Sequence, residues 1–178
     1  FPLDRAMWGP QLSALADVAR VVAPDMPGFG ESSAAEFTIE GVAAVVSDFM
    51  TALGIPAATV CGLSMGGYVA LALARMHPDR LRGLILADTR AGVDDTTAKA
   101  NRSKAVELVT EQGTAALFEG MLSRVVSDST RETAPDLVAR LKAIAGRQRP
   151  ASVAAALAAL RDRPDANPVL NTIAVPTL

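Results

Sequence analysis

The residues Gly62-Leu63-Ser64-Met65-Gly66 are the strongest indication of the fold in this sequence, and they follow a short apolar run at residues 57–61. A Gly-x-Ser-x-Gly pattern between an apolar strand and an apolar helix is typical of a sharp strand-to-helix turn. The serine of such a turn has strained backbone angles, which lift its Oγ clear of the sheet edge. We expect glycines around the turn because strand and helix pass so close that a Cβ at Gly62 or Gly66 would clash. The pattern therefore predicts that Ser64 is presented for chemistry.

The segments on either side of this turn alternate between strand and helix patterns. Apolar, β-branched runs predict short buried strands, and apolar residues at helical spacing predict helices. The predicted strands are 21–23, 57–61 and 81–87, and the predicted helices are 7–19, 38–53 and one from the turn to about residue 76. This order predicts an α/β protein with a parallel sheet and crossover helices.

The pattern changes after residue 91. Residues 92–165 contain no strand signal but four helical stretches, which are punctuated by Gly113, Pro135 and Pro150. These stretches are about 97–112, 114–127, 136–146 and 151–161. We expect residues 1–91 to form part of the core, residues 92–165 to form a helical lid, and residues 166–178 to return to the core at the start of a late strand.

Composition excludes several classes of function. The 178 residues carry a net charge of −2 with no basic cluster, which argues against nucleic-acid binding. No apolar run approaches the roughly 18 residues of a membrane span. The single cysteine, Cys61, excludes an internal disulfide and indicates a reducing, cytoplasmic location; we expect it to be buried at a strand end. A single histidine without a Cys-x-x-Cys pair argues against a zinc site.

Several motifs, in the same order along the chain, resemble those of the α/β-hydrolase family. Residues 20–32 resemble a family strand with its Asp-x-Pro-Gly-x-Gly-x-Ser loop, and residues 62–67 resemble the nucleophile elbow. Residues 1–4 resemble the segment just after the family's His-Gly turn, and residues 173–178 resemble the lead-in to a late strand. The similarity covers all 178 residues. Within the family, the elbow together with residues 87–91 looks most like 3-oxoadipate enol-lactonase and related ester hydrolases.

The resemblance implies a serine hydrolase that acts on a small ester or lactone, with no metal or organic cofactor. Ser64 Oγ would attack the carbonyl carbon and form an acyl-enzyme that water then hydrolyses. The backbone N–H of Met65 would donate to the oxyanion, and the second donor maps onto Phe1. In the lid, Phe118 and Met121 are candidates for lining the substrate site.

The base and the acid are harder to assign. The family order is serine, acid, histidine. His77 is the only histidine, and a helix that begins at the turn would place it about 20 Å from Ser64. Asp88, at the end of the neighbouring strand, is a candidate acid, but it has an alternative role in fixing the loop under Arg90. We expect the catalytic histidine and the usual acid to lie past residue 178, and the sequence to be an internal fragment of a longer chain.

Two alternatives stay open. The chain is either part of a hydrolase or a non-catalytic fragment or pseudoenzyme that lacks the histidine and the acid. A cofactor-free haloperoxidase or a C–C hydrolase of the same fold would use the same serine.

Two further expectations concern the framework. We expect Asp25 to organise its loop by accepting backbone N–H groups rather than to act in catalysis. The resemblance also implies that the strand before the His-Gly turn lies between strands 21–23 and 57–61, and that strand is not among these residues.

Overall fold

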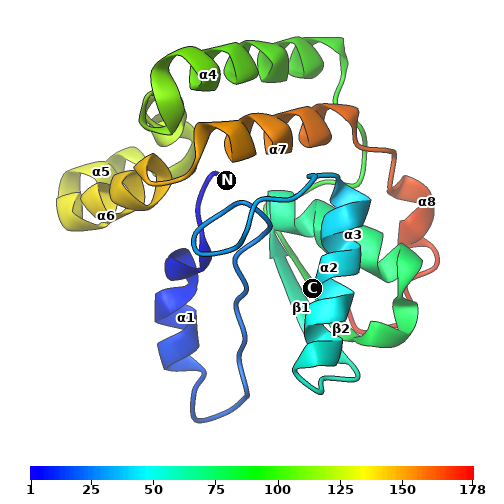
Figure 1. Ribbon diagram of the computed structural model, residues 1–178. Helices are drawn as coiled ribbons and strands as arrows, with labels where there is room; N and C mark the ends of the chain where they lie inside the picture. The colour runs from blue at the N-terminus through cyan, green and yellow to red at the C-terminus, as the bar shows by residue number, and fades with distance from the viewer. The chain divides into compact units, whose positions relative to one another are not determined.

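The computed structural model describes residues 1–178, which divide into two compact units. Unit 1 contains residues 1–35 and 103–157, and unit 2 contains residues 36–102 and 158–178. Figure 1 shows the elements of both units coloured along the chain. Each unit is therefore built from two segments that are distant in sequence.

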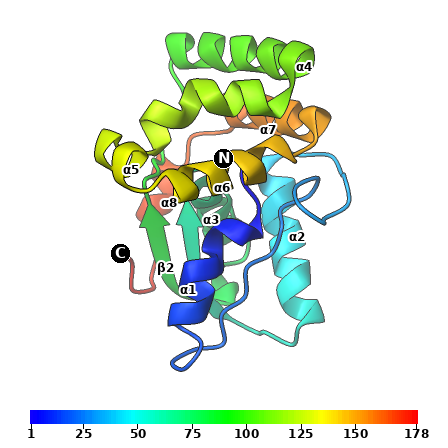
Figure 2. The same ribbon diagram turned by 90° about the vertical axis from the view of Figure 1, so that its left-hand side faces the viewer.

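A small parallel sheet lies in unit 2. Its strands are β1 (Ala58–Leu63) and β2 (Leu81–Ala87), which pair in parallel, and their arrows point the same way in Figure 2. The end of the chain continues this sheet, because Thr177 forms a parallel bridge with Leu84 and the Leu178 N–H donates to the Leu84 carbonyl. The predicted strands at 57–61 and 81–87, and the predicted lead-in to a late strand, are confirmed.

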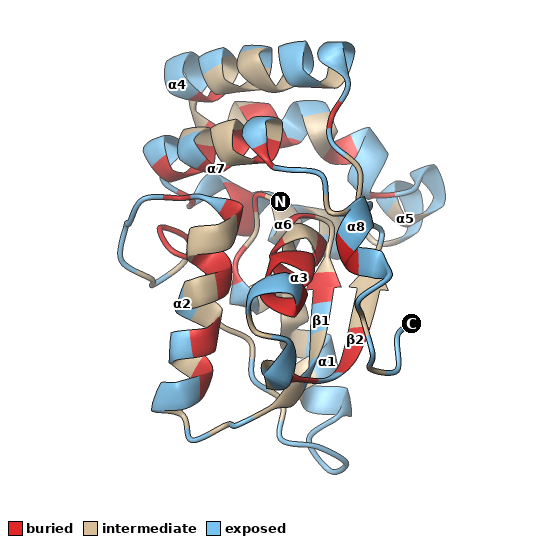
Figure 3. Ribbon diagram, turned by 90° about the vertical axis from the view of Figure 1, so that its right-hand side faces the viewer, coloured by how far each residue is buried: buried red, intermediate tan, exposed pale blue.

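Helix α3 (Met65–Met76) of unit 2 packs on this sheet, and helix α2 (Ile39–Ala52) packs on α3. Helix α2 begins at Thr38, whose Oγ1 accepts a hydrogen bond from the Gly41 N–H at 3.0 Å. Helix α3 contacts β1, β2 and α2, and it is the most deeply buried helix in Figure 3. A helix that is apolar on all sides requires such burial. These elements place the start of α3 directly after the end of β1.

Unit 1 is mostly helical. Its elements include a 3₁₀ turn at Arg5–Trp8, α1 (Gly9–Ala14), most of α4 (Thr96–Val125), α5 (Asp128–Thr133), α6 (Pro135–Gly146) and most of α7 (Pro150–Asp162), whereas the short α8 (Asn167–Leu170) belongs to unit 2. Gly113, at φ 81°, interrupts α4, so the four helices predicted between 97 and 161 are confirmed, with α5 in addition. The core cluster of unit 1 consists of Phe118, Leu122, Val126 and Ala145. None of the helices has the length and apolar character needed to cross a bilayer.

Two predictions near the start of the chain are wrong. Residues 21–23 form no strand, and Val22 is 39% exposed. A strand exists only when its N–H and C=O groups pair with a neighbour, and no ladder includes these residues. The helix predicted over 7–19 ends at Ala14, and the apolar side chains of Leu15 and Val18 beyond it are exposed.

Candidate active site

Ser64 occupies the turn between β1 and α3. Its backbone angles are φ 52° and ψ −111°, and only one other residue besides glycine, Asp88, has a positive φ. This conformation is sterically costly for a residue with a Cβ, so the surrounding structure must hold it. The side chain is half-buried. The strained strand-to-helix turn predicted from the sequence is therefore confirmed.

The glycines around Ser64 differ in how much space a Cβ would have at each of them. A Cβ at Gly62 would lie 2.3 Å from the Gly66 carbonyl oxygen and 2.7 Å from the Gly67 nitrogen, so this glycine is required. A Cβ at Gly66 would meet nothing within 4 Å, so the predicted clash there is wrong. The reason is that the backbone of Gly66 itself presses on Gly62. The second tight contact is at Gly67, where a Cβ would lie 2.4 Å from Thr89 Oγ1.

Hydrogen bonds from two directions hold the Ser64 backbone. Its N–H donates to the Ala87 carbonyl at the end of β2, at 2.9 Å. Its carbonyl oxygen accepts from the Gly67 N–H at 2.9 Å and from Thr89 Oγ1 at 2.9 Å. Residues 87 and 89 therefore tie the turn to the neighbouring strand end.

Met65 is the first residue of α3, and the Met65 side chain is buried. The first N–H groups of a helix have no acceptor within the helix. They also lie at the positive end of the helix dipole, which favours an anion. The Met65 N–H therefore has the chemical character of an oxyanion donor beside Ser64.

The structure brings the candidate acid close to Ser64 but not a histidine. Leu63 pairs with Ala87 across the sheet, so Ser64 and Asp88 follow adjacent strand ends. Asp88 is exposed, and Arg90 pairs with Asp94 rather than with Asp88. His77 lies at the far end of α3, which runs unbroken for 12 residues, or about 18 Å. The predicted position of His77, one full helix length away from Ser64, is confirmed.

The other predicted site residues belong to unit 1. The ring of Phe1 lies edge-on to the ring of Phe29, with centroids 6.2 Å apart. Phe118 is 1% exposed in the core cluster of that unit, and Met121 is half-buried. Their roles as oxyanion donor and as lining residues stay predictions.

A buried carboxylate, which the sequence did not indicate, anchors the segment next to Phe1. Asp4 accepts two hydrogen bonds from Arg147, both at 2.7 Å, one from Gln148 at 2.8 Å and one from the Ala6 N–H at 2.9 Å. Burial acts to raise the pKa of Asp4, but the bonds from Arg147, Ala6 and Gln148 outweigh it, so the pKa is lowered. Arg147 and Gln148 are more than 140 residues away, and no local pattern reveals such a pairing.

Asp25 has the framework role that the sequence predicts. Its carboxylate accepts from the Arg5 N–H at 2.7 Å and from the Glu31 N–H at 3.0 Å, and it pairs with the Arg5 guanidinium. Gly30, at φ 53°, lies so close that a Cβ there would be 2.3 Å from Asp25 Oδ2. Asp25 therefore organises its loop.

A second buried carboxylate lies beyond Asp88 in unit 2. Asp94 is fully buried and pairs with Arg90 at 3.2 Å, Arg102 at 2.5 Å and Arg163 at 2.8 Å. Burial acts to raise the pKa of Asp94, but the hydrogen bonds from Arg163 and Arg102 outweigh it and lower the pKa to about 2. Arg163 also stacks on Tyr68 of α3, with its guanidinium carbon 4.1 Å from the ring centroid. This cluster fixes the loop that carries Asp88 against α3.

Comparison with known proteins identifies the family. A family model described as the alpha/beta hydrolase fold matches residues 1–171. This chain belongs to the α/β-hydrolase family. Its parallel sheet, crossover helices and strained serine turn agree with that membership.

Relatives of this α/β-hydrolase include lactonases and esterases. 3-Oxoadipate enol-lactonase 2 of Acinetobacter baylyi is 30% identical over 175 residues, which cover 97% of this chain and 64% of the relative. A thermophilic esterase from Thermogutta terrifontis superposes with a TM-score of 0.95 at 40% identity, covering 99% of this chain and 66% of that one. The enol-lactonase from Burkholderia xenovorans gives a TM-score of 0.90 at 30% identity, with 99% and 67% coverage. The chain thus spans about two thirds of the length of these relatives.

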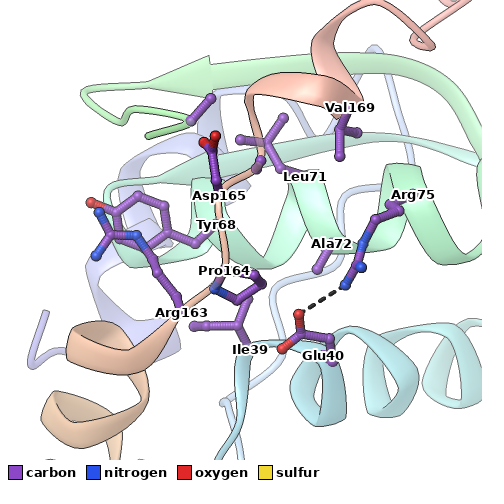
Figure 4. Close-up of a pocket in the computed structure, with 12 residues that line it drawn as sticks. Ile39, Glu40, Tyr68, Leu71, Ala72, Arg75, Arg163, Pro164, Asp165 and Val169 are labelled. Atoms are coloured by element: carbon purple, nitrogen blue, oxygen red, sulfur yellow. Dashed lines mark hydrogen bonds and ion pairs between the residues drawn. The ribbon is translucent and has the colours of Figure 1, made fainter. Parts of the chain in front are cut away.

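The α/β-hydrolase chain also has a shallow pocket in unit 2, away from the turn (Figure 4). It is lined by residues of α3, the start of α2 and the segment 163–169, and it is partly open to solvent. The dashed line in Figure 4 marks the ion pair between Arg75 and Glu40, at 2.8 Å. Neither Ser64 nor Met65 lines it, so this pocket is not the candidate site.

Cys61 is exposed, and the prediction that it is buried is wrong. It lies on β1, where Thr59 and Cys61 share one face of the sheet and both residues are exposed. Partial burial still raises the pKa of the thiol, which keeps it protonated at neutral pH. Cys61 therefore lacks the thiolate character of a nucleophile.

Proposed function

We propose that this protein hydrolyses small esters or lactones, with Ser64 as the nucleophile. The observation that carries the proposal is the strained, positive-φ serine between β1 and α3, beside an N–H group with no acceptor in its helix. The similarity to enol-lactonases and to an esterase supports the substrate class.

The proposed reaction has two steps. Ser64 Oγ loses its proton to a base and attacks the carbonyl carbon, and the carbonyl oxygen becomes an oxyanion. The Met65 N–H and the Phe1 backbone N–H are the proposed donors to that oxyanion. Collapse breaks the carbon–oxygen bond of the ester or lactone, the alcohol oxygen takes the proton, and an acyl-enzyme remains on Ser64. Water then attacks the acyl-enzyme by the same route and releases the acid.

The base in this proposal is a histidine outside residues 1–178. The only histidine present lies at the far end of α3, and the chain spans 64% of its lactonase relative. The acid either lies outside residues 1–178, like the histidine, or is Asp88, which follows the strand adjacent to the serine strand. An acid there would orient the histidine and stabilise its positive charge.

We further propose that residues 92–165 act as the lid of a core formed by residues 1–91 and 166–178. Phe118 and Met121 are the proposed lining residues from that lid. Apolar lining residues would suit a small, mainly apolar acyl group and would limit the access of water to the acyl-enzyme.

The direct test uses the protein encoded by the complete reading frame, assayed with p-nitrophenyl acetate and an enol-lactone. We expect Ser64→Ala to lower kcat by about a millionfold, the size found when a serine nucleophile is removed from a complete triad. Ser13→Ala, at an exposed serine on α1, is the matched control and should leave kcat unchanged. Activity retained in Ser64→Ala would overturn the proposal.

Residues 1–178 expressed alone separate the two open alternatives about the chain. We expect no turnover above the Ser64→Ala level, because no histidine of this segment reaches Ser64. Rapid hydrolysis that Ser64→Ala abolishes would require a base within these residues and would contradict the proposed origin of the histidine.

A further inference from the structure

We propose that Thr89 is a positioning residue that aims the Met65 N–H at the oxyanion. The inference rests on the proposed function, since it concerns how the donor of that reaction is held. Thr89 lies two residues past the end of β2, and its hydroxyl donates to the Ser64 carbonyl oxygen at 2.9 Å.

One peptide group links the hydrogen bond from Thr89 to the proposed oxyanion donor. The Ser64 carbonyl and the Met65 N–H belong to the same planar unit, and in a trans peptide they point in opposite directions. A hydrogen bond that fixes the direction of the carbonyl therefore also fixes the direction of the N–H. Hydrogen bonds in a chain also polarise one another, so a bonded carbonyl makes its N–H a better donor.

The hydrogen bond from Thr89 to the Ser64 carbonyl comes from outside helix α3. The other donor to the Ser64 carbonyl, the Gly67 N–H, is one turn further along the same helix and moves with it. Thr89 instead comes from the neighbouring strand end, where Ala87 accepts from the Ser64 N–H at 2.9 Å. Thr89 and Ala87 thus hold the two peptide groups that flank the strained residue, and they hold both relative to the sheet.

Packing beyond the end of β2 brings Thr89 into place. Asp88, at φ 43°, is the second residue besides glycine with a positive φ, and the chain there turns sharply after β2. The Thr89 side chain then rests on the Cα of Gly67, where a Cβ would lie 2.4 Å from Oγ1 and 2.5 Å from Cβ and Cγ2. Gly67 therefore provides the space that the Thr89 hydroxyl needs to reach the carbonyl.

The experiment uses the complete-reading-frame protein and four variants. Thr89→Val removes the hydroxyl at constant shape, and Thr89→Ser keeps it. Gly67→Ala displaces the Thr89 side chain without altering it. Thr172→Val is the matched control, because Thr172 Oγ1 also donates to a backbone carbonyl in unit 2, that of Val169, at 2.8 Å.

We expect Thr89→Val to lower kcat about fivefold with KM within twofold, which corresponds to the roughly 1 kcal/mol of one neutral hydrogen bond. A trifluoromethyl ketone, which forms a tetrahedral adduct with a serine, should bind more weakly by the same factor. Thr89→Ser should restore both values, Gly67→Ala should reproduce the loss, and Thr172→Val should change neither.

The outcomes also separate this inference from the proposed function. If Ser64→Ala keeps its activity, the proposed function fails, whatever Thr89 does. If Ser64→Ala is inactive while folded Thr89→Val and Gly67→Ala keep the wild-type kcat and ketone affinity, the positioning role is wrong and Thr89 only supports the fold. If Thr89→Val does not fold, the kcat and ketone affinity of Gly67→Ala provide the same test. A melting curve shows whether Gly67→Ala is folded.

Discussion

The serine turn of unit 2 and the Asp4–Asp25 segment of unit 1 hold their backbones by different means. Around Ser64 the contacts are backbone hydrogen bonds, one hydroxyl and glycines pressed against main-chain or side-chain atoms. In unit 1, two buried carboxylates gather N–H groups and arginines. The first arrangement is steric and short-ranged, and the second is electrostatic.

The two regions are therefore sensitive to different changes, one to added volume and the other to altered charge. A steric arrangement fails when a single methyl group is added, but it is insensitive to pH. A charged arrangement tolerates small changes of volume, but it loses stability when a carboxylate is neutralised. The proposed donor Met65 would thus be held by steric contacts, and the proposed donor Phe1 by charged hydrogen bonds.

The largest expected effect comes from the pair Gly62→Ala and Gly66→Ala. A Cβ at Gly62 would lie 2.3 Å from a main-chain oxygen, so we expect a loss of about 3 kcal/mol in the free energy of unfolding. A Cβ at Gly66 meets nothing, so that variant should be neutral or more stable by about 0.5 kcal/mol, as alanine favours a helix. Urea unfolding of both variants measures this, and equal losses would contradict the steric account.

Asp94 provides the pH test of a charged cluster. Its folded pKa of about 2 lies below the ordinary value of 3.8, so its contribution is complete above pH 3.8 and is lost as the pH falls through 2. The contribution amounts to about 2 kcal/mol. Asp94→Asn should therefore be less stable at pH 6 and should lack this acid-dependent loss. Urea unfolding between pH 2 and 6 measures how the free energy of unfolding changes with pH. The same pH dependence in the variant would exclude Asp94 as its source.

A smaller loss is expected for Asp4→Asn in unit 1. The Asp4 side chain is 1% exposed, but its partner Arg147 is 55% exposed, so solvent screens the pair and we expect about 1.5 kcal/mol. Asp162→Asn is the matched control, because Asp162 is exposed and pairs with its neighbour Arg161, and its loss of stability should not be measurable. Thermal melts give the melting temperature of each variant, and equal melting temperatures would mean that Asp4 is not an anchor.

Cys61 gives the smallest effect and reports on the exposed face of β1. Because the residue is exposed, a thiol reagent should label it in the folded protein. Because its pKa is raised, the labelling rate should climb steadily from pH 7 to pH 9 without a plateau. Labelling that needs denaturant would show that this face of β1 is covered in the protein tested.

Features with local causes could be predicted from the sequence, whereas features with distant partners could not. The turn at Ser64 and the helix breaks at Gly113 and Pro135 follow from neighbouring residues. The strand predicted at 21–23 failed because apolar character alone supplies no hydrogen-bonding partner. The requirement for glycine was assigned to Gly66 rather than to Gly67, since the close neighbour at Gly67 is Thr89, on a different strand end.

The charged clusters were missed for the same reason. Asp4 and Arg147 are 143 positions apart, and Asp94 and Arg163 meet only once the fold has formed. In the sequence such residues look like ordinary surface charges. The candidate site was found because its serine, its helix start and the end of the adjacent strand are close in sequence or paired in one small sheet.

The most direct measurement of the central claim is the mass-spectrometric location of a covalent adduct. A fluorophosphonate reacts with a serine only when the hydroxyl is activated and an oxyanion site is beside it. We predict that the complete-reading-frame protein takes up one equivalent, that peptide mapping places it on Ser64, and that Ser64→Ala takes up none. Esterase activity that persists without any adduct on Ser64, or an adduct on another residue that abolishes activity, would contradict the account.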